Sequence, residues 1–307
     1  LFLKDKSSWN KKNEVVIRLI YSMRIKSEEL EKEFQEVGAV RIPNFLNKED
    51  LEEIKKLYKE LNLKELSGIY SNVNNKSEAY NKKVDESFQR IYTNSIAANF
   101  ENYQVGGGAF LIKGTGGESH SSLHQDWNVV DENKYQSAAI FCSIIDVNEQ
   151  NGCLQVIKGS HKWFKNVRSF HTPTPFFNFN QVKDGLKPFP ALAGDAIVFR
   201  HNLIHGSKPN LTNQIRVAAM VSIASKEAQY VHYMKDKDEF RVLEADNHFY
   251  NKQLSKLYSS EEIEVKELGR IPIKNGMVLS FSDFQSKYKQ EFPKTALDFL
   301  RKIFKIS

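Results

Sequence analysis

A histidine and an aspartate stand two residues apart in the tripeptide His124-Gln125-Asp126. Side chains two apart on an extended chain point to the same side, about 6.6 Å apart along the strand, so both can reach one metal ion. A second imidazole must come from elsewhere, and His205 is the best candidate because it follows a β-prone run and begins the sequence His-Gly-Ser. Two imidazoles and one carboxylate on one face of an octahedron are the ligand set of non-haem iron(II) oxygenases, which leaves positions open for a co-substrate and O2.

Other groupings of the eight histidines stay open at this point. His120 and His124, like His201 and His205, are four residues apart, a spacing that binds zinc on a helix. Their surroundings are rich in Gly, Ser and Asn, and on a strand residues four apart lie about 13 Å apart, too far to share a metal ion. Zinc is therefore the less favoured interpretation, and we expect His120 and His201 to be hydrogen-bonding neighbours. A surface turn is the plain alternative for the pair His124 and Asp126.

Arg216 favours the iron interpretation. It lies on a predicted strand over 214–224, eleven residues after His205, and the connecting loop allows the two segments to run antiparallel side by side. A guanidinium in the same cavity as a metal ion can bind a carboxylate in bidentate fashion. For 2-oxoglutarate this would be the distal carboxylate, while the keto-acid end chelates iron. A surface salt bridge is the alternative role for Arg216.

The elements that would position these residues begin with helices. Ser27 and Asn47 are typical N-cap residues, and the first predicted helix ends near Gly38. A third helix is expected over 84–99, after a polar segment over 62–83 that we interpret as a loop. The first hundred residues are therefore predicted to be mainly helical.

The middle of the chain has the pattern of short strands. Both alternating sets of side chains over 139–145 are apolar, which predicts a strand covered on both faces. A short strand over 40–42 ends at Pro43, which places it at a sheet edge or strand end. Helices followed by many short strands indicate an α+β protein with a β-sandwich or jelly-roll core. The β-prone runs are 103–112, 137–147, 153–157, 196–199 and 214–224.

We expect one domain over residues 1–307, because sandwiches and barrels of this length often form single domains. Its helical portion would cover about 25–100, its β-core about 100–225, and a C-terminal extension about 226–307. The extension is expected to end in a short amphipathic helix over 294–304.

One segment of the core has few regular signals. Residues 161–190 are rich in Pro and Phe, which is typical of a lid or binding loop. Phe176, Phe177 and Phe179 would then cover the pocket, and anchoring of the loop in the core is an equal alternative. Whether this loop is a lid stays open at this point.

Composition limits the class of protein. The net charge is +6 and the pI is about 9.0, which predicts a solvated basic surface or, alternatively, attraction of an anionic substrate. No nucleic-acid-binding motif and no run of 18 apolar residues occurs, so neither nucleic acid nor a membrane is expected as a partner. Cys142 and Cys153 lie in apolar segments and are expected to be buried free thiols. With no signal-peptide pattern at the N-terminus, a cytoplasmic location is expected.

Four segments in order resemble the phytanoyl-CoA dioxygenase family of Fe(II)- and 2-oxoglutarate-dependent oxygenases. The likeness covers most of residues 34–224. Each segment alone is moderately specific, and the four in order are strongly so. The segments are FQEVGAVRIPNFLNKEDLEEIKKLY, SSLHQDW, NGCLQVIKGSHK and AGDAIVFRHNLIHGSKPNLTNQIRVA.

The resemblance implies a double-stranded β-helix fold, which is a cupin-like jelly roll. It implies iron ligands at His124, Asp126 and His205, with Arg216 and Ser207 binding the co-substrate 2-oxoglutarate. No catalytic side chain beyond the metal site is implied. Related halogenases replace the carboxylate by Gly or Ala, so the presence of Asp126 favours hydroxylation.

Lys113 is a further candidate for the co-substrate site. It lies on the strand before the H-x-D tripeptide, where some members of the family place a polar residue near 2-oxoglutarate. Trp127, Tyr135 and Phe177 are candidates to line the substrate pocket.

The expected reaction is hydroxylation of an unactivated C–H bond with O2, releasing succinate and CO2. The substrate would be a small metabolite or an acyl group tethered to CoA or a carrier protein. Desaturation or cyclisation would use the same residues, and the oligomeric state is left open. Two other classes remain: a cupin-like metal-binding protein without oxygenase activity, and a non-catalytic interaction protein on the same fold.

Overall fold

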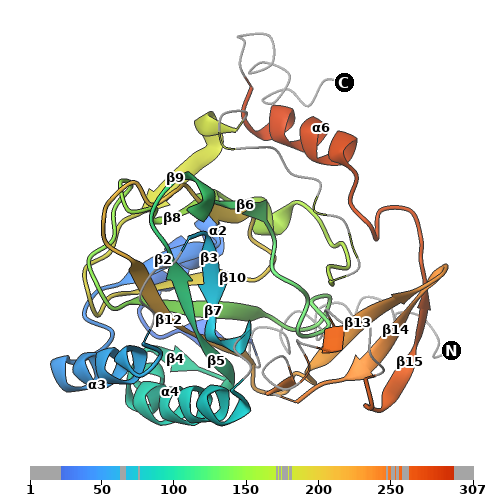
Figure 1. The fold of residues 1–307 in the computed structure, drawn as a ribbon. Coiled ribbons are helices and arrows are strands. Elements are labelled where there is room, and N and C mark those ends of the chain that lie inside the picture. The colour runs from blue at the N-terminus through green and yellow to red at the C-terminus, as the bar shows by residue number, and fades with distance from the viewer. Residues whose placement is uncertain are drawn as a thin grey trace, which may run out of the picture.

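Two antiparallel sheets packed face to face form the centre of the computed structural model (Figure 1). The first sheet has the strand order β2-β10-β7-β12-β5-β3. In that order its strands are Ala39–Ile42, Ala196–Arg200, Ser137–Ser143, Arg216–Ser225, Tyr103–Lys113 and Ile69–Ser71. The structure describes residues 22–62, 67–74, 77–170, 172, 174, 179, 182–246, 248–249, 253, 256–257 and 263–293.

The second sheet has four strands in the order β6-β11-β8-β9. They are Ser121–His124, His205–Ser207, Leu154–Ile157 and Leu186–Phe189. Apolar side chains from both sheets meet between them, among them Phe141 and Phe199 from the first sheet and Leu154 and Val156 from the second. The antiparallel sandwich with flanking helices confirms the predicted α+β jelly-roll class.

Three helices cover the outer face of the six-stranded sheet. They are α2 (Glu28–Val37), α3 (Lys48–Lys59) and α4 (Glu78–Asn99). Their apolar faces bury Phe34, Ile54 and Phe88 against the sheet, in a cluster that also contains Ile140. Because Phe141 faces the other way, into the sandwich, β7 is buried on both faces as predicted.

A separate three-stranded sheet follows the core. It is formed by β13 (Val231–Asp236), β14 (Glu239–Glu244) and β15 (Glu267–Pro272), to the right in Figure 1. Helix α6 (Phe281–Glu291) packs Phe284 and Tyr288 against the outer face of the four-stranded sheet. The remaining elements are β1 (Arg24–Ile25), β4 (Phe100–Glu101), and the short 3-10 helices η1 (Asn72–Asn74), η2 (Gly117–Ser119), η3 (Ser160–Lys162) and η5 (Lys183–Gly185).

Several predictions from local sequence are confirmed. Ser27 and Asn47 cap α2 and α3 with their side chains, and Gly38 ends α2 in the left-handed region. Strand β2 lies at the edge of its sheet, as the following Pro43 predicted. Cys142 and Cys153 are buried free thiols. In the part of the chain that is described, no helix is long and apolar enough to cross a membrane.

Other predictions are wrong. The segment 62–83 is not all loop, because β3 forms within it and α4 begins at Glu78, where the Ser77 side chain accepts a hydrogen bond from the Tyr80 backbone. The segment 161–190 contains strand β9, which pairs with β8. The helix expected over 294–304 lies outside the described residues.

Strand β5 is paired with β3 only over its last residues, so much of one edge lacks a partner strand. Side chains replace the missing strand there. The backbone N–H groups of Gly108 and Phe110 donate to Asp85 Oδ1 at 2.8 Å and Asn72 Oδ1 at 2.6 Å. The Gln89 side chain donates to the Gly106 carbonyl. The edge is thus hydrogen-bonded by α4 and the turn before it.

Gly38 joins α2 to β2 and has little room for a side chain. Its φ is +88°, and a Cβ there would lie 2.4 Å from His161 Nδ1 and 2.7 Å from Leu203 Cδ1. Gly276 has a similar φ of +83°, with no atom within 4 Å of such a Cβ. A comparison of substitutions at the two glycines therefore distinguishes the cost of the left-handed backbone from the cost of a steric clash.

We expect Gly38→Ala to lower the free energy of unfolding by more than about 2 kcal/mol, since a left-handed alanine costs about 1 kcal/mol before any clash. Gly276→Ala should cost only about 1 kcal/mol. Urea denaturation of both variants measures the difference. Equal losses would show that the His161 and Leu203 contacts do not constrain the turn.

Candidate metal centre

The two histidines of the candidate triad are brought together by strand pairing. In the antiparallel pair β6 and β11, the Cα atom of His124 lies opposite that of His205. Their ring centroids are 4.3 Å apart. Asp126 follows β6 directly, and its backbone N–H donates to the His201 carbonyl at 2.8 Å, which holds the turn against the end of β10.

Both imidazoles are oriented by the same local hydrogen bond. His124 Nδ1 lies 2.8 Å from the Ser122 carbonyl, and His205 Nδ1 lies 2.9 Å from the Leu203 carbonyl. A carbonyl only accepts, so each Nδ1 carries a proton, and Nε2 is the nitrogen of the neutral ring that can bind a metal ion. The two Nε2 atoms face Asp126 Oδ1 at 3.6 and 3.7 Å.

The three side chains form a group that could hold a metal ion. Their ligand atoms all lie within 4.8 Å of one another. The His205 side chain is only 6% exposed, whereas those of His124 and Asp126 are about a third exposed, at 33% and 32%. The group is therefore anchored on the buried side and open on the other.

Burial and mutual charge set the protonation of the group. Burial lowers the pKa of His205 to about 4, with a further contribution from the charge of His124. Burial also acts to lower the pKa of His124, but the hydrogen bond and charge of Asp126 outweigh it and raise that pKa. For Asp126 burial acts to raise the pKa, and the charge of His205 and the hydrogen bond from His124 lower it overall. Near neutral pH the group has a carboxylate and at least one neutral imidazole.

Arg168 supports this turn and was missed by sequence reasoning. Its Nε donates to the Asp126 carbonyl at 2.7 Å, and its Nη2 is paired with Glu132 at 2.6 Å. The side chain is buried. A lone arginine in the irregular segment 161–190 gives no local signal, because its partner is 42 residues away in the chain.

His201 behaves as expected for a hydrogen-bonding neighbour. Its Nδ1 lies 2.9 Å from Ser137 Oγ, and its backbone carbonyl accepts from Asp126. His120 is exposed between η2 and β6. The structure therefore brings His201 to the triad. Among the described residues, the group that could hold a metal ion contains His124 and His205 but neither His120 nor His201.

Arg216 lies at the start of β12, with its guanidinium 5.3 Å from the centroid of the Phe141 ring inside the sandwich. Its Nη1 donates to the Gly152 carbonyl at 2.8 Å. Its Nε is buried and has no hydrogen-bond partner among the described residues. Burial lowers the pKa of Arg216 to about 10, so the group stays cationic at neutral pH. A buried cation with an unused donor fits a carboxylate ligand.

Lys113 lies opposite Arg216 in the pair β5 and β12, but its ammonium group already has partners. It donates to the carbonyls of Ser119, just before β6, and of Lys208, just after β11, the latter at 2.8 Å. The Ser207 carbonyl lies at 3.5 Å. Burial, followed by the charge of Arg216, lowers the pKa of Lys113 to about 7. Through these contacts, Lys113 links the two strands that carry His124 and His205.

The candidate pocket residues are placed differently from one another. Trp127 forms an edge-to-face contact with Phe170, with centroids 5.9 Å apart. Tyr135 packs against a cluster that includes Val130 and Tyr230, at the side of the three-stranded sheet. Phe177, like Phe176, lies outside the described residues.

Phe179 lies on the outer face of the four-stranded sheet. A Cβ at Gly206 would come within 3.0 Å of its Cζ, and the ring packs in the cluster beneath α6. This is the anchoring role that was kept as the alternative to a lid.

Comparison with known proteins agrees with this geometry. Residues 34–218 match the phytanoyl-CoA dioxygenase (PhyH) family. Dioxygenase olcK of Penicillium canescens is 27% identical over 137 residues, which cover 42% of this chain and 41% of olcK. Dioxygenase cdmD of Talaromyces verruculosus is 35% identical over 81 residues, covering 26% and 24% of the two chains. The chain thus matches less than half the length of these curated relatives.

The fold is also found among solved structures. The epimerase SnoN, in a crystal structure with Fe3+, alpha ketoglutarate and nogalamycin RO, superposes with a TM-score of 0.50 at 15% sequence identity. The superposition covers 82% of this chain and 95% of SnoN, and at this identity it shows the fold alone. The family match spans more than half of the chain and includes both candidate histidines and Arg216. The chain belongs to the phytanoyl-CoA dioxygenase family, whose members are non-haem oxygenases that use iron and 2-oxoglutarate.

Proposed function

We propose that this protein is an Fe(II)- and 2-oxoglutarate-dependent dioxygenase that hydroxylates a C–H bond of a small organic substrate. The proposal rests on one observation: two features lie together in the interior of the sandwich. They are the group of two imidazoles and a carboxylate, and a buried arginine with an unused donor. A binding protein on this fold would need neither.

His124, Asp126 and His205 would hold the iron. The donor set is the one that non-haem iron prefers, and both Nε2 atoms already face the carboxylate. When bound, iron with 2-oxoglutarate supplies the oxidation of a C–H bond by O2, with release of succinate and CO2. The retained Asp126 carboxylate supports hydroxylation over halogenation.

Arg216 would bind the distal carboxylate of 2-oxoglutarate, with help from Ser207. The Phe141 ring and the Gly152 carbonyl hold its guanidinium in one orientation, so little side-chain entropy remains to be lost on binding. Ser207 is buried on β11, two residues after His205. The position of Lys113 in the sequence suggested that it helps to bind 2-oxoglutarate. Its contacts support a different role, which is to fix the strands on either side of the site.

The substrate would lie beside the metal, against the inner face of β12. Met220 and Ser222 are partly exposed there, although β12 is flanked by strands on both sides. Partial exposure on a central strand supports an open space over this face. Phe199, whose ring lies 4.6 Å from that of His205, would form its wall next to the metal.

We expect metal binding to the apo-protein between pH 5 and 6 to release about one proton. Both imidazoles must be neutral to bind. His205, with its pKa lowered to about 4, has already lost its proton, whereas His124, with its pKa raised, still holds one. Between pH 5 and 6 the affinity for Co(II) or Fe(II) should therefore rise about tenfold per pH unit. Calorimetry in buffers of different ionisation enthalpy counts the protons.

Two variants control this measurement. His124→Ala should abolish binding, and His120→Ala, which changes an exposed histidine, should leave the pH slope unchanged. A slope of two protons over the same range would contradict the assignment of a neutral His205.

We expect Arg216 to distinguish 2-oxoglutarate from 2-oxovalerate, which has a methyl group in place of the distal carboxylate. The Fe(II)-loaded protein should bind 2-oxoglutarate at least about 30-fold more tightly, because an unpaired buried charge costs about 2–5 kcal/mol. Arg216→Met should lose this preference and leave the affinities for iron and for 2-oxovalerate nearly unchanged. Anaerobic titration of the visible charge-transfer band of the chelated keto acid measures both.

Arg200→Met is a matched control. Arg200 is also a buried arginine stacked on a ring, Phe34, and its Nε likewise has no partner among the described residues, but it lies against α2 and donates to Gln35. Its removal should leave the preference intact. Loss of the preference in Arg200→Met, or its retention in Arg216→Met, would refute the placement of the distal carboxylate.

A further inference from the structure

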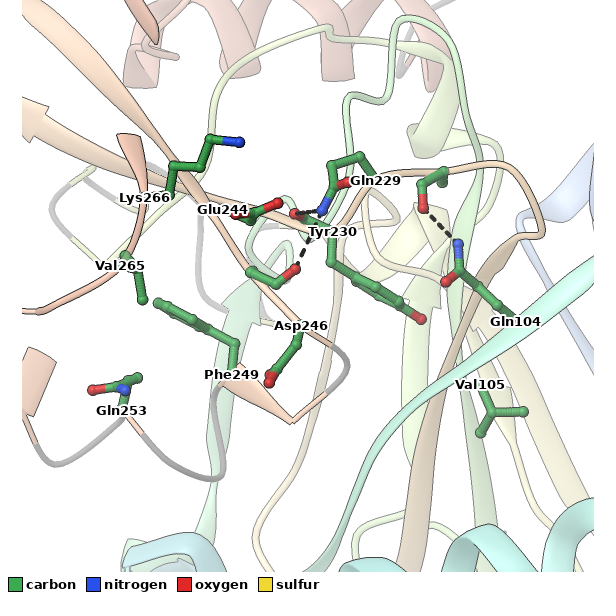
Figure 2. Close-up of a pocket in the computed structure, with 12 residues that line it drawn as sticks. Gln104, Val105, Gln229, Tyr230, Glu244, Asp246, Phe249, Gln253, Val265 and Lys266 are labelled. Carbon is green, nitrogen blue, oxygen red and sulfur yellow. Dashed lines mark hydrogen bonds between the residues drawn. The ribbon is translucent and has the colours of Figure 1, made fainter. Parts of the chain in front are cut away.

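A pocket of about 740 Å³ lies between the start of β5 and the three-stranded sheet (Figure 2). All of its lining residues except Gln104 and Val105 come after residue 218, where the family match ends. The pocket is therefore built mainly by the C-terminal extension. The metal centre alone does not explain why the protein has this pocket.

Tyr230 is the buried polar group of this pocket. The residue is only 8% exposed, and its hydroxyl has no hydrogen-bond partner among the described residues. Figure 2 shows the hydroxyl directed toward the strand of Gln104 and Val105. A Cβ at residue 106 would lie 3.1 Å from this hydroxyl, so Gly106 makes the room for it. An unpaired buried hydroxyl costs stability, and a ligand can offset that cost.

The other polar groups of the pocket are mostly acceptors. Gln253 Oε1 is buried without a partner, while the Gln229 amide nitrogen is already bonded to the Tyr230 and Ala245 carbonyls. Among the described lining residues, Glu244 and Asp246 carry carboxylates and Lys266 carries the one ammonium group. The pocket thus favours a hydrogen-bond donor that is neutral or cationic, and disfavours phosphate.

The pocket is connected to the triad by the chain itself. Tyr230 forms a β-bridge with Val130, four residues after Asp126, and Val231 N–H donates to the Val129 carbonyl at 2.9 Å. Tyr135, a candidate pocket residue from the sequence, packs in the same cluster as Val130 and Tyr230. The extension is therefore fastened to the segment that carries the metal ligands.

The strand register gives the distance across the inner face. Phe199 lies beside Ala139, and Ala139 lies beside Ser222 on the next strand. Neighbouring strands are about 4.8 Å apart, so Ser222 is about 10 Å from the strand whose Phe199 touches His205. A Cβ at Gly106 would lie 3.1 Å from both Ser222 Cβ and the Tyr230 hydroxyl. One molecule about 10–15 Å long can span this face.

We propose that this pocket is the distal part of the substrate site, and that it takes the hydroxyl- or amine-bearing end of an elongated, non-anionic substrate whose other end lies at the triad. The proposal rests on the proposed oxygenase function and names its substrate class. Tyr230 is the specificity-determining residue of the pocket. An acyl group tethered to CoA or a carrier protein would bring phosphate to a pocket with excess carboxylate, so it is disfavoured.

Three probes that share a benzyl group and differ in charge test the class of ligand: benzyl alcohol, benzylamine and benzylphosphonate. Their binding to the full chain, loaded with 2-oxoglutarate and either Zn(II) or Mn(II), is measured by ligand-observed NMR. Benzyl alcohol and benzylamine should bind, and benzylphosphonate should not. Mn(II) should enhance their relaxation moderately, as for a distance of about 10–15 Å from the metal.

Variants locate the binding. Tyr230→Phe should weaken benzyl alcohol about three- to tenfold, the value of one neutral hydrogen bond, while thermal stability stays equal or rises because an unpaired hydroxyl is removed. Ala228→Trp, which fills the pocket, should abolish binding of both probes. Tyr233→Phe is the matched control, since Tyr233 is equally buried but lies outside the lining. Thermal unfolding followed by circular dichroism reports folding of each variant.

The outcomes separate the pocket from the metal centre. Preferred binding of benzylphosphonate, equal binding to wild type and Tyr230→Phe, or relaxation so strong that the probe must touch the metal would each overturn the proposal. If the variants act as expected and Mn(II) has no effect because the triad holds no metal, the pocket stands and the oxygenase function fails. If Mn(II) binds and no probe distinguishes the variants, the pocket proposal fails and the oxygenase function stands.

Discussion

The pairing of β6 with β11 is the constraint on which the site depends. It places His124 opposite His205, and hydrogen bonds to carbonyls two residues back turn both rings the same way. The register of two short strands therefore determines whether a metal can bind. A slip of one residue would send one imidazole to the outer face of the sheet.

Two buried basic side chains on neighbouring strands have different roles, one in holding the structure together and one in binding a ligand. The Lys113 amino group donates to carbonyls from the flanks of β6 and β11 and has no carboxylate partner among the described residues, and burial lowers its pKa to about 7. Arg216, directly opposite, stays cationic at neutral pH and has one bond to Gly152 and an unused Nε. The lysine donors are used by the protein, whereas part of the arginine charge is left for a ligand.

What the sequence could predict follows from how local each signal is. The caps at Ser27 and Asn47 involve residues three apart, and these predictions are confirmed. The spacing of His124 and Asp126 is equally local, and their side chains do lie within reach of one another. The start of α4 was missed because a buried Asn81, bonded to Asn72, made a helical turn look like polar loop. The contacts of Arg168 and of Lys113 with Lys208 span 42 and 95 residues, so no local pattern could reveal them.

The side chains that hydrogen-bond the open edge of β5 have a consequence for the behaviour of the molecule in a crowded solution. An unpaired strand edge is a template on which another chain can add a strand. Here Asp85, Asn72 and Gln89 occupy those backbone groups, and α4 stands in the way. Because this strand also borders the pocket at Gln104 and Val105, the side chains that make its edge a poor template for another chain lie next to the pocket.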